Sequence, residues 1–130
     1  MSTSDNNKAY NEWILQSDYD YETAEAMYST ARYVYAVFMC HLCIEKIIKS
    51  QYLKQLDKVA PKSHNLLWLA EQIKLEFPEH LYKFVFQLND ASLPTRYPQE
   101  LKAAIKAYPK EVTLVILNKT KELQQWIKQQ

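Results

Sequence analysis

The chain contains no glycine in its 130 residues, and this absence limits its possible folds more than any other feature. Glycine adopts positive φ at the least cost, so its loss removes the easiest left-handed turns, helix C-caps and hairpin turns. Helices are therefore favoured over tightly turning sheets. Glycine-rich phosphate loops and the dinucleotide fingerprint are excluded. A bound phosphate would need cationic side chains or a helix N-terminus instead.

The composition fits one domain without strong charge. Hydrophobic residues make up 48% of the chain, enough for a single core, and charged residues make up 24%. Sixteen basic and 15 acidic residues leave a formal charge of +1. General nucleic-acid binders usually carry a large basic excess, because phosphate contacts dominate their affinity. The balance argues against general nucleic-acid binding and leaves open a local nucleotide pocket.

Apolar residues recur at helical spacing along most of the chain, with prolines at several breaks. The segments predicted to be helical are residues 8–30, 31–56, 65–76, 78–89, 99–107 and 109–128. The second of these is the most broadly apolar, which predicts that it is the central helix. The expected fold is all-α, an antiparallel up-down bundle of four main helices plus a short additional helix.

The remaining segments set the boundaries of this domain. Residues 1–7 are predicted to be a disordered tail, and residues 8–130 a single helical domain. Residues 90–98 contain two prolines and are predicted to form a loop. The Val and Ile residues at 112–117 would also suit a short strand, but the sequence shows no partner strand for it.

Two cysteines, Cys40 and Cys43, form a C-x-x-C pattern. The pattern lies inside a predicted helix and lacks the second pair of ligands that a structural zinc site needs. Thioredoxin-like motifs follow a strand, which is absent at this position. We expect both cysteines to be buried, reduced thiols, with no metal and no cofactor.

His41, Glu45 and Lys49 follow one another at helical spacing (i, i+4, i+8) and lie on one face of the predicted central helix. They could form a buried polar ladder, because a buried carboxylate normally requires partners. They could equally line a cleft or a dimer groove. The hydrogen-bonded ladder is the favoured interpretation, and the groove stays open.

Lys62 and His64 lie where the helix predicted over residues 65–76 begins. Side-chain donors close to exposed backbone N–H groups would form an anion site. The alternative is a capping turn, in which Ser63 is the N-cap and His64 makes a local hydrogen bond.

Arg96 is the best single candidate for direct ligand contact, and its neighbour Tyr97 could either stack on a base or pack its ring into the bundle. They lie between Pro94 and Pro98, and two prolines in the predicted loop would restrict the backbone around both side chains. A guanidinium group suits phosphate or carboxylate, and a tyrosine ring can stack on a base. The alternative is that Arg96 pairs with a carboxylate and anchors the loop.

An ordered series of residues resembles the HEPN family, whose name refers to nucleotide binding in higher eukaryotes and prokaryotes. The chain is similar to its small stand-alone prokaryotic members from about residue 10 to residue 128. The positions that carry the resemblance are Trp13, residues 18–24, residues 31–33, Ala36, Glu45, Lys46, Lys49, residues 61–66 (PKSHNL), residues 88–89 and residues 96–98.

The resemblance implies a helical bundle, commonly a homodimer, that binds nucleotides, serves a minimal nucleotidyltransferase partner or cuts RNA. It also places His64 and Arg96 among the recurring polar positions of the family. HEPN ribonucleases resemble one another in an Arg followed, four to six residues later, by a His on one helix. In this chain the first histidine after Arg32 is His41, which is too distant, and no histidine follows Arg96.

The leading hypothesis is therefore a noncatalytic HEPN-like homodimer that binds a nucleotide, a minimal nucleotidyltransferase or both. One alternative is a metal-independent, toxin-like ribonuclease with a degenerate motif, as in toxin–antitoxin systems. The other is a purely structural dimeric interaction protein. Metal catalysis has poor support, because Glu22 and Glu25 lack an accompanying Glu-x-x-His motif. Without a long apolar run or a signal-peptide core, no membrane contact and a cytoplasmic location are expected.

Overall fold

The computed structural model describes residues 3–130, with side chains from residue 5 onward. This part of the chain forms helices and no strands, which confirms the all-α prediction. Four helices are long and two, α3 and α5, have seven residues each. The elements are α1 (Thr3–Ser29), α2 (Tyr33–Leu56), α3 (Leu66–Gln72), α4 (Glu79–Arg96), α5 (Leu101–Ala107) and α6 (Lys110–Lys128).

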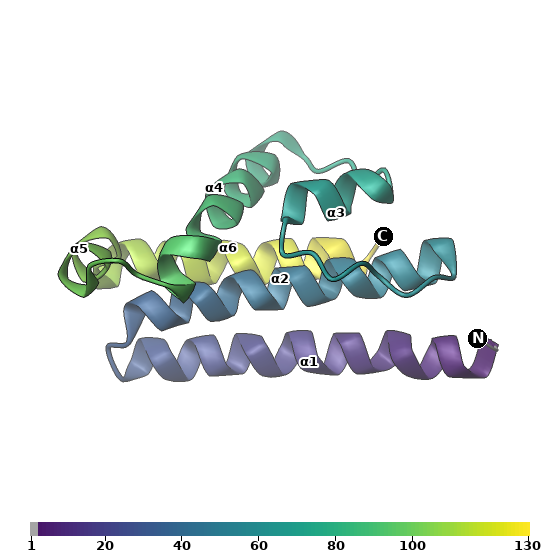
Figure 1. Cartoon of the computed structure of the whole chain (residues 1–130), viewed down its shortest axis with the longest axis horizontal. Helices are drawn as coiled ribbons and strands as arrows, with labels where there is room; N and C mark the ends of the chain where they lie inside the picture. Colours follow the sequence, from purple (N-terminus) through teal and green to yellow (C-terminus); the bar gives the residue numbers. More distant parts are fainter. Residues whose placement is uncertain (1–2) are drawn as a thin grey trace.

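Helix α2 is the central helix, as its breadth of apolar residues predicted. It packs against all five other helices, and fourteen of its 24 residues are buried. α1 runs antiparallel to α2 along nearly its whole length, and α6 lies along α2 as a third long helix (Figure 1). α3 and α4 lie on the side of α2 away from α1, where they cover its remaining face (Figure 1).

The hydrophobic core lies around α2 and receives side chains from every helix except α5, which has no buried residue. Its largest fully buried apolar side chains are Phe84, Ile44, Ile47, Ile48, Leu66, Leu69, Leu81, Leu88, Leu123 and Ile127. Burying a side chain of this size contributes roughly 1.5–3 kcal/mol each. This core fixes α2 rigidly, so polar side chains on α2 have well-defined positions.

The prediction of a loop over residues 90–98 is wrong for residues 90–96, which are helical. α4 continues to Arg96, with Pro94 inside its last turn. Proline removes one backbone donor, but here the affected carbonyl belongs to the exposed Asp90 and can be hydrated. The turn is closed by the Tyr97 N–H, which donates to the Leu93 carbonyl at 2.9 Å. Thr95 is buried, and its hydroxyl donates to the Ala91 carbonyl at 2.7 Å.

The disordered tail predicted for residues 1–7 also needs correction. α1 begins at Thr3, so residues 3–7 are helical, whereas residues 1–2 lie outside the described part. Asn6 is buried, and its amide donates to a carboxylate oxygen of Asp57, which follows the end of α2. This contact attaches the first turn of α1 to the central helix.

At three helix ends of the described chain, a residue other than glycine adopts the left-handed conformation that glycine usually takes. Ala31, Asp57 and Lys74 have φ values of 62°, 54° and 53° and lie just after α1, α2 and α3. The left-handed conformation costs a non-glycine residue roughly 1–2 kcal/mol. These three helix ends therefore keep the usual left-handed geometry at some cost in stability, whereas the C-caps of α4, α5 and α6 have negative φ. Among the helices of residues 3–130, none has both the length and the hydropathy for a membrane crossing.

Candidate anion-binding site

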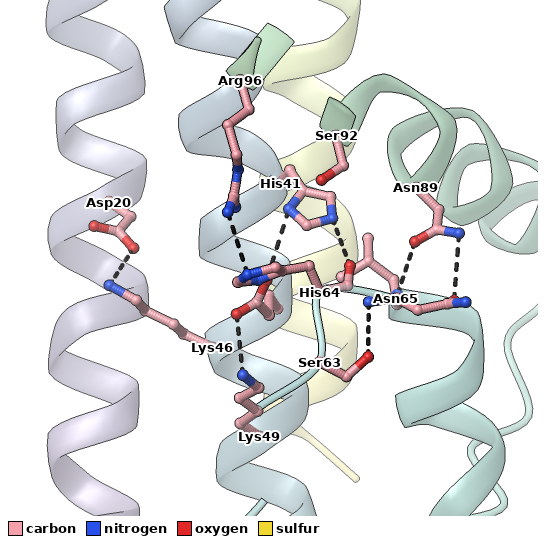
Figure 2. A network of polar contacts seen from close by, with 12 residues as sticks. Asp20, His41, Lys46, Lys49, Ser63, His64, Asn65, Asn89, Ser92 and Arg96 are labelled. Carbon is pink, nitrogen blue, oxygen red and sulfur yellow. Dashed lines mark hydrogen bonds and ion pairs between the residues drawn. The ribbon is translucent and has the colours of Figure 1, made fainter. Parts of the chain in front are cut away.

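Polar side chains from three distant segments meet on one face of α2 (Figure 2). Glu45 comes from α2, His64 from the turn before α3, and Arg96 from the last turn of α4. His64 Nδ1 lies 2.8 Å from Glu45 Oε1, and Arg96 Nη1 lies 3.2 Å from His64 Nε2. Two patterns that the sequence offered as separate candidates, the turn and the arginine, therefore form one cluster with the polar ladder.

The contacts of His64 fix where its proton lies. A guanidinium group can only donate, so Nε2 of His64 must accept the hydrogen bond from Arg96. Its ring proton is therefore on Nδ1, from which it is donated to Glu45. The result is a directional chain in which Arg96 donates to His64 and His64 donates to Glu45.

Glu45 is the buried carboxylate at the centre of this cluster. Only 4% of it is exposed, and its second oxygen accepts a hydrogen bond from Lys49 Nζ at 3.1 Å. Lys49 is itself buried, and its ammonium group lies 5.7 Å from the centre of the Trp13 ring. A buried carboxylate is stable only with such partners. Both Lys49 and His64 therefore hold the charge of Glu45 in place.

His41 holds the backbone of the turn. Its ring is fully buried, and Nε2 donates to the His64 carbonyl at 3.0 Å. Nδ1 is consequently unprotonated, 3.9 Å from Glu45 Oε1 and without a hydrogen-bond partner in the described structure. Burial lowers the pKa of His41 from 6.5 to about 4, against the opposing effect of the Glu45 carboxylate. His41 is thus neutral at neutral pH.

Arg96 is positioned by α2 as well as by α4. Its guanidinium carbon lies 4.9 Å from the centre of the half-buried Phe38 ring of α2, a cation–π arrangement. Nε of Arg96 is buried without a hydrogen-bond partner among the described residues. The side chain is half-buried. Arg96 is therefore held over the cluster by a helix end and a ring, and not by a loop between two prolines.

The turn before α3 caps the helix differently from the prediction. Asn65, and not Ser63, is the N-cap, because its side-chain oxygen accepts from the Trp68 N–H at 3.0 Å. The Leu66 N–H donates to the Asn89 side chain at 2.8 Å. Two of the N–H groups that could have bound an anion are thus already used. An anion at this place would depend on side chains.

Two predicted site residues lie outside the cluster of contacts. Lys62 is exposed in the turn. Tyr97 is 68% exposed and lines a separate groove between the end of α4 and α5, with a volume of about 580 Å³. The other residues lining this groove are Leu93, Pro94, Pro98, Gln99, Glu100, Ala103, Ala104, Ala107 and Tyr108.

The HEPN domain model matches residues 10–130, nearly the whole chain. The protein belongs to the HEPN family. Its fold is similar to the crystal structure of TT1696 from Thermus thermophilus, with a TM-score of 0.79 and 21% identity over 92% of this chain and 96% of that one. It is also similar to ST0689, described as an archaeal HEPN homologue, with a TM-score of 0.70 and 24% identity over 92% and 94% of the two chains. Comparison with curated proteins gives no match.

In this HEPN chain the arginine and the histidine that meet come from different segments. Arg96 and His64 are 32 residues apart, so the ribonuclease spacing on one helix is not what brings them together. The contact between the two side chains exists only in the folded protein. A sequence search for the helical motif could not have found it.

The cysteines of this HEPN chain are unsuited to chemistry. Cys40 and Cys43 are free and fully buried, and burial raises the pKa of each thiol to about 12. Among the described residues, no group of three or more His, Cys, Asp or Glu is arranged to hold a metal ion. Glu22 and Glu25 are both exposed.

One neighbour of the cluster, Phe38, is predictable from helical spacing but does not stand out in the sequence by residue type. Phe38 lies three residues before His41 and seven before Glu45, which places it on the same face of α2. An aromatic ring at the end of a polar face is a ready platform for a guanidinium group. Asn65 and Asn89 lie in segments that resemble the HEPN family. Their capping contacts depend on the packing of α3 against α4.

Proposed function

We propose that this HEPN protein is a noncatalytic module that binds a nucleotide, with the phosphates at Arg96 and His64. The observation that carries the proposal is the contact between these two side chains at an exposed position above buried Glu45. A guanidinium and an imidazole are the two side chains best suited to phosphate oxygens near neutral pH. The side chain of His64 is 54% exposed, so a ligand can reach it.

Unused donors of Arg96 support a ligand at this place. Its Nε is buried without a hydrogen-bond partner in the described part of the chain. Buried polar atoms are nearly always paired, so an unpaired one requires an explanation. Arg96 also has donors beyond the one that contacts His64, because guanidinium carries five. A phosphate group would offer acceptors to this side chain.

The groove beside Tyr97 is proposed to take the base of the nucleotide. Its volume of about 580 Å³ and its largely apolar lining suit a small aromatic ligand. Tyr97 directly follows Arg96, so the groove begins next to the residue that would hold the phosphates. An exposed tyrosine ring offers a stacking surface to any base. Lys62, exposed in the turn of His64, supplies a further positive charge.

The chemistry of the histidines favours binding over catalysis. RNA cleavage without a metal needs one group that accepts a proton and one that donates a proton. Nε2 of His64 accepts from Arg96, and fully buried His41 donates its Nε2 proton to a backbone carbonyl. Neither ring of the candidate site is free to serve a substrate as it stands.

We also propose a homodimer and a minimal nucleotidyltransferase as the partners of this protein, with a cytoplasmic location. Side chains around α5 support an interaction surface, because large apolar groups are exposed there. These are Leu93, Leu101, Ile105, Val112, Leu114 and Val115.

The test is a titration of the purified protein with ATP, GTP and short RNA, followed by the melting temperature and the dimer mass. A ligand at a hundred times its dissociation constant stabilises the fold by about 2.7 kcal/mol. We expect a saturable shift with one nucleotide that is lost in Arg96→Ala and kept in His80→Gln. His80 is the matched control, because it also contacts a carboxylate at 2.8 Å but lies in the first turn of α4 and pairs with Glu122 of α6.

If a well-folded dimer shows no shift in melting temperature with any nucleotide, the proposed nucleotide site is wrong. The protein would then be a purely structural interaction module, and its partner would have to be sought by co-purification.

A second candidate, the metal-independent ribonuclease of toxin type, has one observation in its favour. The Glu45 carboxylate orients the His64 ring by a bond to Nδ1, which is how a carboxylate commonly orients an imidazole base. Incubation of labelled RNA with the protein in excess EDTA tests it. Cleavage that is abolished in His64→Ala would replace the noncatalytic proposal, and intact RNA with both proteins would remove this candidate.

A further inference from the structure

We infer that anion binding at the Arg96–His64 site takes up one proton, so that the site binds a dianion with His64 in its doubly protonated form. The inference rests on the proposed phosphate site and adds its regulation by pH. It follows from the direction of the hydrogen bonds at the site, described above.

In the structure, the lone pair of His64 Nε2 is directed toward Arg96. An anion cannot hydrogen-bond to this atom, because both would be acceptors. The anion could contact the remaining donors of Arg96, but the Nε2 lone pair beside it would then face negative charge and add no hydrogen bond. The neutral ring therefore disfavours the ligand.

Protonation of Nε2 removes this conflict. One proton from solvent adds to Nε2, the ring becomes a cation, and the bond from Arg96 is lost. Both Nε2–H and the guanidinium can then donate to the oxygens of the same dianion. One hydrogen bond from Arg96 to the ring is thus exchanged for charge-assisted bonds from both cations to the dianion, which favours the complex.

Glu45 is positioned to stabilise the imidazolium ring. Its carboxylate accepts the Nδ1 proton at 2.8 Å and is 4% exposed, so solvent screens this charge weakly. The cationic groups nearby oppose protonation. Arg96 from α4 contacts Nε2, Lys49 from α2 contacts the second oxygen of Glu45, and Lys62 lies two residues before His64 in the turn. A dianion reverses this excess of positive charge, which links the proton to the ligand.

His41 cannot take the proton in place of His64. Its Nε2 already carries a proton and donates it to the His64 carbonyl, and its ring is fully buried. Burial lowers the pKa of His41 to about 4, which keeps it neutral over the pH range of the test. The change is therefore confined to the exposed ring.

The test uses sulfate, which stays a dianion across neutral pH, so any pH dependence comes from the protein. Calorimetric titrations at constant ionic strength should show affinity falling by up to about tenfold per pH unit from roughly pH 6 to pH 8, the slope for one linked proton. Repeating them in two buffers of different ionisation enthalpy measures the protons taken up, with about one expected per sulfate where free His64 is neutral. Inorganic phosphate then extends the result to the proposed ligand.

Variants separate the role of His64 from a general effect of pH. His64→Gln keeps an amide donor but cannot change charge, so its sulfate affinity should be weaker and independent of pH. His80→Gln should keep the wild-type slope, because His80 pairs with Glu122 on the surface of α4 and α6. Circular dichroism at each pH verifies that every variant is folded.

Nitrogen-15 NMR of the imidazole rings gives a direct readout of the same change. Free His64 should show the Nδ1–H tautomer at pH 8, and the sulfate complex should show both nitrogens protonated. Sulfate binding with no proton uptake and a neutral ring would overturn the inference and leave the phosphate site standing. A folded protein that binds neither sulfate nor phosphate at any pH would overturn both.

Discussion

Among the described residues, two polar networks of similar size differ in which of their groups are exposed to water. The α1–α6 network consists of Ser17, Asp18, Cys43, Gln124 and Lys128. Gln124 donates to Ser17 at 3.0 Å and to Asp18 at 2.9 Å, and Ser17 donates to the Cys43 carbonyl at 2.7 Å. The α2–α4 network consists of His41, Glu45, Lys49, His64 and Arg96.

Hydrogen bonding alone does not separate a structural network from a site. Ser17 and Gln124 are fully buried at the centre of the α1–α6 network, so no ligand can reach them. In the α2–α4 network Glu45 is equally sealed, but the His64 side chain above it is 54% exposed. A buried charge that fixes an exposed group is the arrangement expected of a preorganised binding site.

The largest effect on stability is expected from Glu45, the buried carboxylate of the α2–α4 network. Glu45→Ala leaves the Lys49 charge buried without its carboxylate, which should reduce the free energy of unfolding by about 3–5 kcal/mol. The matched control is Glu122→Ala, whose carboxylate pairs with His80 on the surface and should cost under about 0.5 kcal/mol. Urea unfolding at neutral pH measures both. Equal losses would mean that Glu45 is not the buried anchor of the network.

The next effect is the pH dependence contributed by His41. The folded protein resists protonating this ring, whose pKa is lowered from 6.5 to about 4, whereas the unfolded chain takes up the proton first. Stability is therefore complete above about pH 6.5 and falls as the pH drops toward 4, by at most about 3 kcal/mol. The measurement is urea unfolding at several pH values for wild type and His41→Gln. Identical pH profiles for the two proteins would show that His41 titrates normally.

A smaller loss is expected at the buried centre of the α1–α6 network, and it should leave sulfate binding unchanged. Gln124→Ala removes the donor to Ser17 and Asp18 and should lower the free energy of unfolding by about 1–3 kcal/mol. Sulfate affinity should equal that of wild type, since the two networks share no residue. A change in sulfate affinity in the folded variant would break the distinction between the networks.

The smallest effect on stability is expected at the exposed end of the α2–α4 network. Arg96→Ala loses one hydrogen bond and the contact with Phe38, which together should contribute about 1 kcal/mol or less. Its sulfate affinity should nevertheless fall at least about tenfold, because a hydrogen bond to a charged ligand is worth roughly 1.5–3 kcal/mol. The opposite result, a large loss of stability with normal sulfate binding, would make Arg96 a structural anchor.

Most helices were predictable because their signals are local. Apolar spacing and proline positions located the long helices and identified α2 as central. They failed at Pro94, because a proline in the last turn of a helix costs only one hydrogen bond when its carbonyl partner is exposed. They also missed the first turn of α1, which Asn6 attaches to Asp57 across 51 residues of sequence.

The residues of the candidate site were predictable one by one, but their assembly was not. His41, Glu45 and Lys49 share a helical face by spacing alone, and the turn at His64 and the arginine at position 96 stood out by residue type. Nothing local indicates that His64 and Arg96 meet above Glu45, because that depends on how α3 and α4 pack on α2. The contact between the Asn65 turn and Asn89 depends on the same packing. Phe38 shares the helical face of His41 by spacing, but its contact with Arg96 also needs that packing.

The sequence by itself determined an all-helical HEPN chain, since helical periodicity, proline placement and the family's ordered residues are properties of the linear chain. It also determined which groups were available for chemistry. Only the tertiary structure decided which of those groups meet and which face water. The physical reason is that burial is set by the packing of distant helices: α6 closes over Ser17 and Gln124, while the end of α4 brings Arg96 to an exposed His64.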